Sequence, residues 1–203
     1  MRSIATREDI RDLILDAADR LLARSGYKKM TVEDLAHEVG IGKGTIYLHF
    51  PSKEEVVLSH VDRIVERVKA ELRRLAAADG PAPSRLREML LARVLIRFDS
   101  VQHYTESISD LLAALRPGLL ARRRRHFQEE AEIIARVLDD GRAASVFDFT
   151  DDAHTTARAL LTATNALLPY SLSTRELGRR EDVEQETARV IALLLEGLVA
   201  RPG

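Results

Sequence analysis

The 203-residue sequence contains no cysteine and no tryptophan. Without cysteine the chain cannot form a disulfide scaffold, an iron–sulfur cluster or a thiol nucleophile. Charged residues or threonine interrupt every apolar stretch before the roughly 18 to 20 residues that a membrane-spanning helix needs, and residues 1–10 lack the apolar region of a signal peptide. We therefore expect a soluble cytoplasmic protein, and nothing in its composition predicts a cofactor.

An excess of charge of either sign is lacking as well. The chain has 31 Lys and Arg against 32 Asp and Glu, a formal net charge of -1. The molecule as a whole therefore carries no basic signature for nucleic acid, and any contact with a polyanion has to be local. Hydrophobic residues make up 45% of the chain, enough for a buried core, which excludes collagen-like and wholly disordered classes.

The sequence is rich in helical periodicity. Apolar residues recur at three- and four-residue spacing from end to end, and no alternating run of the kind that predicts a strand is found. Glycine, proline and capping residues divide the periodic segments, with Gly26 and the Arg116-Pro117-Gly118 triplet among the expected breaks. We predict an all-α fold of about nine helices, at residues 6–26, 31–40, 43–50, 52–78, 84–100, 104–115, 119–140, 151–170 and 181–200.

The second and third of these helices are short and are joined by a glycine-containing turn, which is the helix-turn-helix pattern. Ordinary helical hairpins share this spacing, so the spacing alone does not indicate DNA binding. The residues of the third helix have to distinguish the two cases. Gly44, Thr45, Tyr47 and Leu48 are expected to face outward, although an internal glycine costs about 1 kcal/mol relative to alanine. No acidic residue lies between Val39 and Lys53. A closely approaching polyanion would account for these features together.

Three runs carry a resemblance to a known family: TVEDLA at 31–36, GIGKGTIYLHF at 40–50 and SKEE at 52–55. Together they resemble the DNA-binding signature of TetR/AcrR transcriptional regulators, over residues from about 7 to 58. The resemblance implies a homodimer whose third helices enter successive major grooves of a palindromic operator. It also implies a helix-turn-helix domain at 1–53, with its motif at about 31–50, and a ligand-binding and dimerisation bundle at 54–203.

The resemblance also assigns roles to individual positions. Lys43, Gly44, Thr45 and Leu48 match positions that face bases or the groove floor, and Leu48 suits a thymine methyl. Gly42 stands where relatives often have a hydroxyl residue, so only its backbone N–H remains as a donor. The remaining matches, at phosphate-contacting positions, are Thr31, Tyr47, His49 and Lys53. The full set of expected DNA-binding residues is Thr31, Gly42, Lys43, Gly44, Thr45, Tyr47, Leu48, His49 and Lys53.

The remaining chain gives weaker expectations. Residues 151–170 and 181–200 are apolar nearly all round, which predicts a twofold dimer through an antiparallel pairing of these helices into a four-helix bundle. The run of four arginines at 122–125 is interpreted as a solvated, salt-bridged face, and no metal site is expected. Five residues are candidates for the ligand cavity, although a role in the core is the simpler interpretation for them: Met89, Phe98, His103, Tyr104 and Phe127.

The predicted function is a ligand-responsive DNA-binding regulator, acting at the nucleoid as a repressor that a small-molecule inducer releases from its operator. One alternative is a helical small-molecule-binding or interaction dimer that does not recognise an operator. A second is an all-helical enzyme using Asp99, His103 and Glu106, but no nucleophile or metal spacing supports it. We therefore do not expect an enzyme.

Overall fold

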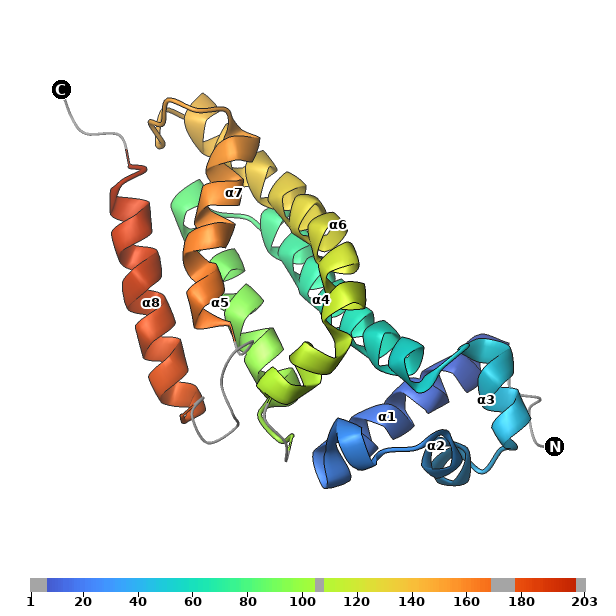
Figure 1. Ribbon diagram of the computed structural model, residues 1–203. Helices are drawn as coiled ribbons and strands as arrows, with labels where there is room; N and C mark the ends of the chain where they lie inside the picture. Colours follow the sequence, from blue (N-terminus) through green and yellow to red (C-terminus); the bar gives the residue numbers. More distant parts are fainter. Residues whose placement is uncertain (1–6, 105–107, 169–177, 200–203) are drawn as a thin grey trace.

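The computed structural model describes residues 7–104, 108–168 and 178–199. These residues form eight α-helices and one 3-10 turn (Figure 1), with a single isolated bridge between Phe147 and Val199. The predicted all-α class is confirmed, and none of the described helices is both long and apolar enough to cross a membrane. The helices are α1 (Arg7–Lys29), α2 (Val32–Val39), α3 (Lys43–His49), α4 (Lys53–Ala76), α5 (Ala82–Val101), α6 (Ile108–Ala143), α7 (Ala153–Thr164) and α8 (Arg180–Glu196), with the turn η1 (Asn165–Leu167) after α7.

The helices α1, α2 and α3 pack around one core, at one end of the molecule (Figure 1). Gly26 leaves the helical conformation at φ 73°, as its expected role as a stop requires, although helical residues continue beyond it to Lys29. Leu13 falls at the helical spacing that predicts the buried face of the helix at 6–26, but it is 47% exposed, so that prediction is wrong at this position. Thr6, the first residue of the predicted helix at 6–26, lies outside the described residues.

A second core lies between α4, α5, α6, α7 and α8. The two cores meet along α4, whose first turns (Val56, Val57 and Leu58) belong to the amino-terminal core, while Val68 and Leu72 belong to the second. Figure 1 shows α4 running from the amino-terminal helices into the bundle. A movement of α4 in the bundle is therefore a movement of the core on which α1 to α3 pack.

The expected break at residues 116–118 is wrong. The predicted helices at 104–115 and 119–140 are one helix, α6, with Pro117 inside it, so the chain has eight described α-helices rather than nine. Gly118 has a different role, because a Cβ there would lie 2.5 Å from Cδ1 of Leu58 on α4. The glycine permits a close approach of α6 to α4, and it does not end the helix.

Candidate nucleic-acid interface

The turn between α2 and α3 is defined by its caps. The hydroxyl of Thr31 accepts from the backbone N–H of Asp34, and the Asp34 carboxylate accepts from the backbone N–H of Thr31, which is a complete capping box. At the other end of α2, Gly40 adopts a left-handed conformation at φ 76° and donates to the carbonyl of Ala36. These contacts set the angle at which α3 leaves α2.

The third helix is buried on one side and bare on the other. Ile46 and Phe50 are 0% exposed and belong to the amino-terminal core. Leu48 is 75% exposed and Tyr47 is 48% exposed. The outward face expected from the sequence is therefore present, and it exposes apolar surface to solvent without a described neighbour to cover it. Gly42, Lys43 and Gly44 are exposed beside it, and Thr45 is half-buried.

Lys43, at the first position of α3, forms an ion pair with Glu33 in the first turn of α2. Its ammonium also lies 6.0 Å from the centroid of the Tyr47 ring. The hydrogen bond from Lys43 holds the pKa of Glu33 below its ordinary value, and the same bond raises the pKa of Lys43. Glu33 was absent from the residues singled out by sequence, because its spacing from Lys43 matches no local pattern.

Two cations at the edge of this surface serve the fold. Lys53 donates to the carbonyl oxygens of Tyr27 and Met30, at 3.0 Å each, and lies 4.3 Å from the Tyr27 ring centroid. Arg11, which sequence reasoning missed, donates to the carbonyl of His49 at 3.3 Å. With His49 and the first two residues of α1, Arg11 lines a hollow of about 480 Å³. An arginine on an otherwise exposed helix face gives no signal of such a role.

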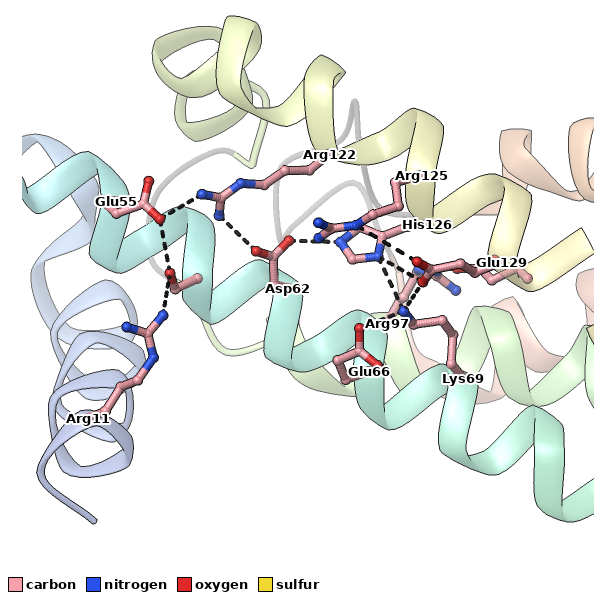
Figure 2. A network of polar contacts seen from close by, with 12 residues as sticks. Arg11, Glu55, Asp62, Glu66, Lys69, Arg97, Arg122, Arg125, His126 and Glu129 are labelled. Carbon is pink, nitrogen blue, oxygen red and sulfur yellow. Dashed lines mark hydrogen bonds and ion pairs between the residues drawn. The ribbon is translucent and has the colours of Figure 1, made fainter. Parts of the chain in front are cut away.

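A chain of polar contacts leads from this end of the molecule into the bundle (Figure 2). Arg11 donates to Ser59 Oγ at 3.2 Å, and Ser59 Oγ donates to Glu55 at 3.3 Å. Arg122 on α6 then donates to Glu55 at 2.7 Å and to Asp62 at 2.8 Å. The sequence predicts a solvated, salt-bridged face for the run 122–125, and residues 123–125 are exposed, whereas Arg122 is partly buried and ties α6 to two carboxylates that lie two turns apart on α4.

The chain continues through His126, whose Nε2 lies 2.7 Å from Asp62 Oδ1. Its Nδ1 lies 3.5 Å from Nζ of Lys69, a buried lysine that also pairs with Glu66 at 2.5 Å and with Glu129. Glu66, His126 and Glu129 bring one potential metal-ligand atom each to within 4.8 Å of one another. The Lys69 ammonium already lies among these atoms and supplies one positive charge to the two carboxylates.

A second junction joins α1 to α4 and to the end of α5. Tyr104 donates to Asp19 at 3.0 Å, and its hydroxyl lies 2.8 Å from Nε2 of the buried His60. Burial alone would raise the pKa of Asp19, but the hydrogen bond and charge of His60 and the hydrogen bond from Tyr104 outweigh it and lower this pKa to about 2. Burial, followed by the charge of Asp19, raises the pKa of Tyr104.

The five candidate ligand residues lie in different surroundings. Met89 is in the bundle core, Tyr104 is in the amino-terminal core, and Phe98 packs in a small separate cluster. Phe127 is partly buried against the bundle, and His103 is exposed, 3.5 Å from Asp19. None of them lines the 480 Å³ hollow or a second one on α6. Their contact with a ligand stays a prediction.

The two described residues of the enzyme alternative, Asp99 and His103, each contact another charged residue. Asp99 pairs with Arg180 at 3.0 Å, His103 approaches Asp19, and Glu106 lies outside the described residues.

Residues 14–59 match the model of the family described as bacterial regulatory proteins, tetR family. The chain is 42% identical over 60 residues to the HTH-type transcriptional regulator EthR of Mycolicibacterium smegmatis, covering 30% of this chain and 28% of EthR. It is 34% identical over 80 residues to the HTH-type transcriptional repressor KstR of the same organism, covering 39% of each chain. These matches span well under half the length of either relative. EthR is named as a transcriptional regulator and KstR as a transcriptional repressor.

Over its whole length the chain resembles the crystal structure of a TetR-family transcriptional regulator from Pectobacterium atrosepticum. The TM-score is 0.75 at 19% identity, covering 100% of both chains. The likeness shows that the bundle behind the helix-turn-helix has the fold seen in such regulators.

Proposed function

We propose that this chain, whose residues 14–59 match the model of the tetR family of bacterial regulatory proteins, is a dimeric transcriptional regulator that binds duplex DNA. Residues 1–53 form the DNA-binding domain and residues 54–203 the ligand-binding and dimerisation domain. The observation that carries the proposal is the bare face of α3, where Leu48 and Tyr47 are 75% and 48% exposed at a helix opened by Lys43. Recognition helices of helix-turn-helix proteins use such a face in the major groove.

Each exposed residue of α3 has a chemistry that suits DNA. Lys43 and Thr45 can donate to base acceptors, and Leu48 offers apolar contact to a thymine methyl. Gly44 allows the groove floor to approach the backbone. Phosphates on either side are contacted by the phenol of Tyr47, by His49, by Thr31 and by the backbone N–H of Gly42, while the third N–H of the Lys53 ammonium remains for a phosphate.

Dimerisation is assigned to α7 and α8, which lie side by side at one edge of the bundle (Figure 1). Leu193 on α8 is 70% exposed, and Val199 just beyond it is 45% exposed. Ala159 and Ala163 give α7 a small-residue outer surface. A twofold pairing of the two helices would cover these residues. Binding to two half-sites one turn of B-DNA apart then requires two copies of α3 about 34 to 36 Å apart.

The ligand response is assigned to α4. A small molecule bound in the bundle would shift α4 or α6, and the contacts of Arg122 would carry that shift to the amino-terminal core. We propose that the molecule acts in the cytoplasm at the nucleoid as a repressor, and that its inducer releases it from DNA. Equal operator affinity with and without a saturating ligand would contradict this response.

The test is selection of duplexes from a random pool by the full-length protein, followed by fluorescence anisotropy of the selected duplex at several salt concentrations. A DNA-binding regulator should show log K falling linearly with log salt, by about 0.9 for each phosphate neutralised. Leu48→Ala and Thr45→Ala should change base preference, whereas Leu193→Glu should give a monomer by light scattering. A chain that binds every duplex equally weakly would favour the alternative of a ligand-binding dimer without operator recognition.

A further inference from the structure

Two exposed acidic side chains, Glu33 and Asp34, lie at the start of α2, beside the surface proposed to read DNA. Asp34 caps α2 at Thr31, whereas Glu33 pairs with Lys43. Glu33 and Lys43 join the starts of α2 and α3, and their side chains are 62% and 48% exposed. Because a carboxylate on this surface weakens its attraction for a polyanion, general affinity for DNA does not explain Glu33. A role in choosing between sequences does explain it, since a carboxylate accepts hydrogen bonds only and repels acceptors that come near it.

The pair presents donors and acceptors side by side. The Lys43 ammonium has three N–H groups, of which one meets Glu33, and the Glu33 carboxylate keeps lone pairs after accepting it. In the major groove, guanine presents two adjacent acceptors, N7 and O6, and its partner cytosine presents the N4 amino donor beside them. In an A·T pair the adenine amino group separates the two acceptors, N7 and O4. A Lys and Glu pair therefore matches G·C better than A·T.

We infer that Glu33 is a specificity-determining residue, and that Glu33 and Lys43 together read one G·C pair in each half-site. Lys43 donates to guanine N7 and O6, and Glu33 accepts from cytosine N4. The inference rests on the proposed DNA-binding function. Without its carboxylate partner, Lys43 would be free to pair with any nearby phosphate or acceptor.

The experiment compares the wild-type chain with Glu33→Gln and Glu33→Ala on its selected duplex. Single G·C to A·T replacements are made along each half-site, and binding is measured by anisotropy at several salt concentrations. One replacement should weaken wild-type binding by about tenfold, and most of that preference should vanish in Glu33→Ala. The salt slope of this variant should steepen by up to about 0.9, because Lys43 becomes available to a phosphate. Base preference at the other positions of the half-site should be the same in Glu33→Ala as in the wild-type chain.

The matched control is Glu71→Gln, which removes a carboxylate paired with Arg74 at 2.7 Å on the surface of α4. It should leave every base preference unchanged. If the wild-type chain selects a duplex but both Glu33 variants keep its full G·C preference, the inference alone fails. If a Glu33 variant loses base preference equally at all positions of the half-site, the inference also fails, because that result indicates a role of Glu33 in folding. A wild-type chain that selects no duplex overturns the proposed function and this inference together.

Discussion

Replacing Lys53 by methionine keeps the aliphatic stem and removes only the ammonium group. That group donates to two carbonyl oxygens, of Tyr27 and Met30, at the end of α1, where backbone oxygens have no helical partner. A hydrogen bond from a charged donor contributes about 1.5 to 3 kcal/mol, and an exposed cation–π contact about 0.5 to 1 kcal/mol. Water regains access when the half-buried ammonium leaves, so we expect a net loss of about 2 kcal/mol in the free energy of unfolding.

For a chain of this size that loss lowers the melting temperature by about 4 to 8 °C. Urea denaturation followed by circular dichroism measures the free energy, and Lys29→Met, which removes an exposed lysine nearby on α1, should change it by less than about 0.5 kcal/mol. Anisotropy on DNA separates the two roles of Lys53, since loss of a phosphate contact also flattens the salt slope by about 0.9. Unchanged stability in Lys53→Met would refute the assignment of Lys53 as a link between α1 and α4.

Three further substitutions test the interior. Glu130 is buried and pairs with two buried arginines, Arg93 and Arg97. Glu130→Gln removes the carboxylate that they share and should lower the free energy of unfolding by about 3 kcal/mol in urea titrations. The pKa of Asp19 falls from 3.8 unfolded to about 2 folded, so its contribution to stability is complete above pH 4 and is lost as the pH falls toward 2. Asp19→Asn should flatten acid denaturation curves over that range. Gly118→Ala places a Cβ 2.5 Å from buried Leu58 and should destabilise the chain by about 1 kcal/mol, an effect that Leu58→Ala in the same chain should reduce.

The helix-turn-helix could be predicted because local chemistry determines it. The capping box of Thr31, the left-handed Gly40 and the inward Ile46 each follow from residues within a few positions in the chain. The bare face of α3 follows from the same spacing. Contacts with bases and phosphates cannot be predicted from local chemistry alone, because they depend on the geometry of the complex with DNA. They stay predictions.

The rest depended on neighbours distant in sequence. Pro117 and Gly118 form a strong local break signal, yet packing of α6 on α4 keeps the helix continuous across them. Arg122 differs from the three arginines that follow it only in what faces it across 60 or more residues of chain. Glu33 was missed because its partner Lys43 lies ten residues away on the next helix, at a spacing that matches no local pattern. Hydrophobic periodicity predicts which side of a helix is buried, but it does not predict which charged side chains form ion pairs with one another.

The ion pairs along α4 bear on how a ligand signal could reach the DNA. Arg122 holds Glu55 and Asp62, two carboxylates that lie two turns apart on α4, so a tilt of α4 against α6 has to lengthen at least one of these contacts. The contacts from α1 to α4 move with α4, because Arg11 bonds both Ser59 and the last residue of α3. The joint between α4 and α6 combines these partly exposed ion pairs of Arg122, which contribute about 1 kcal/mol or less each, with the contacts of the buried Lys69 and His126. A ligand with a differential affinity of only a few kcal/mol for the tilted state would suffice to shift such a joint, while the recognition helix keeps its own geometry and is displaced as a unit.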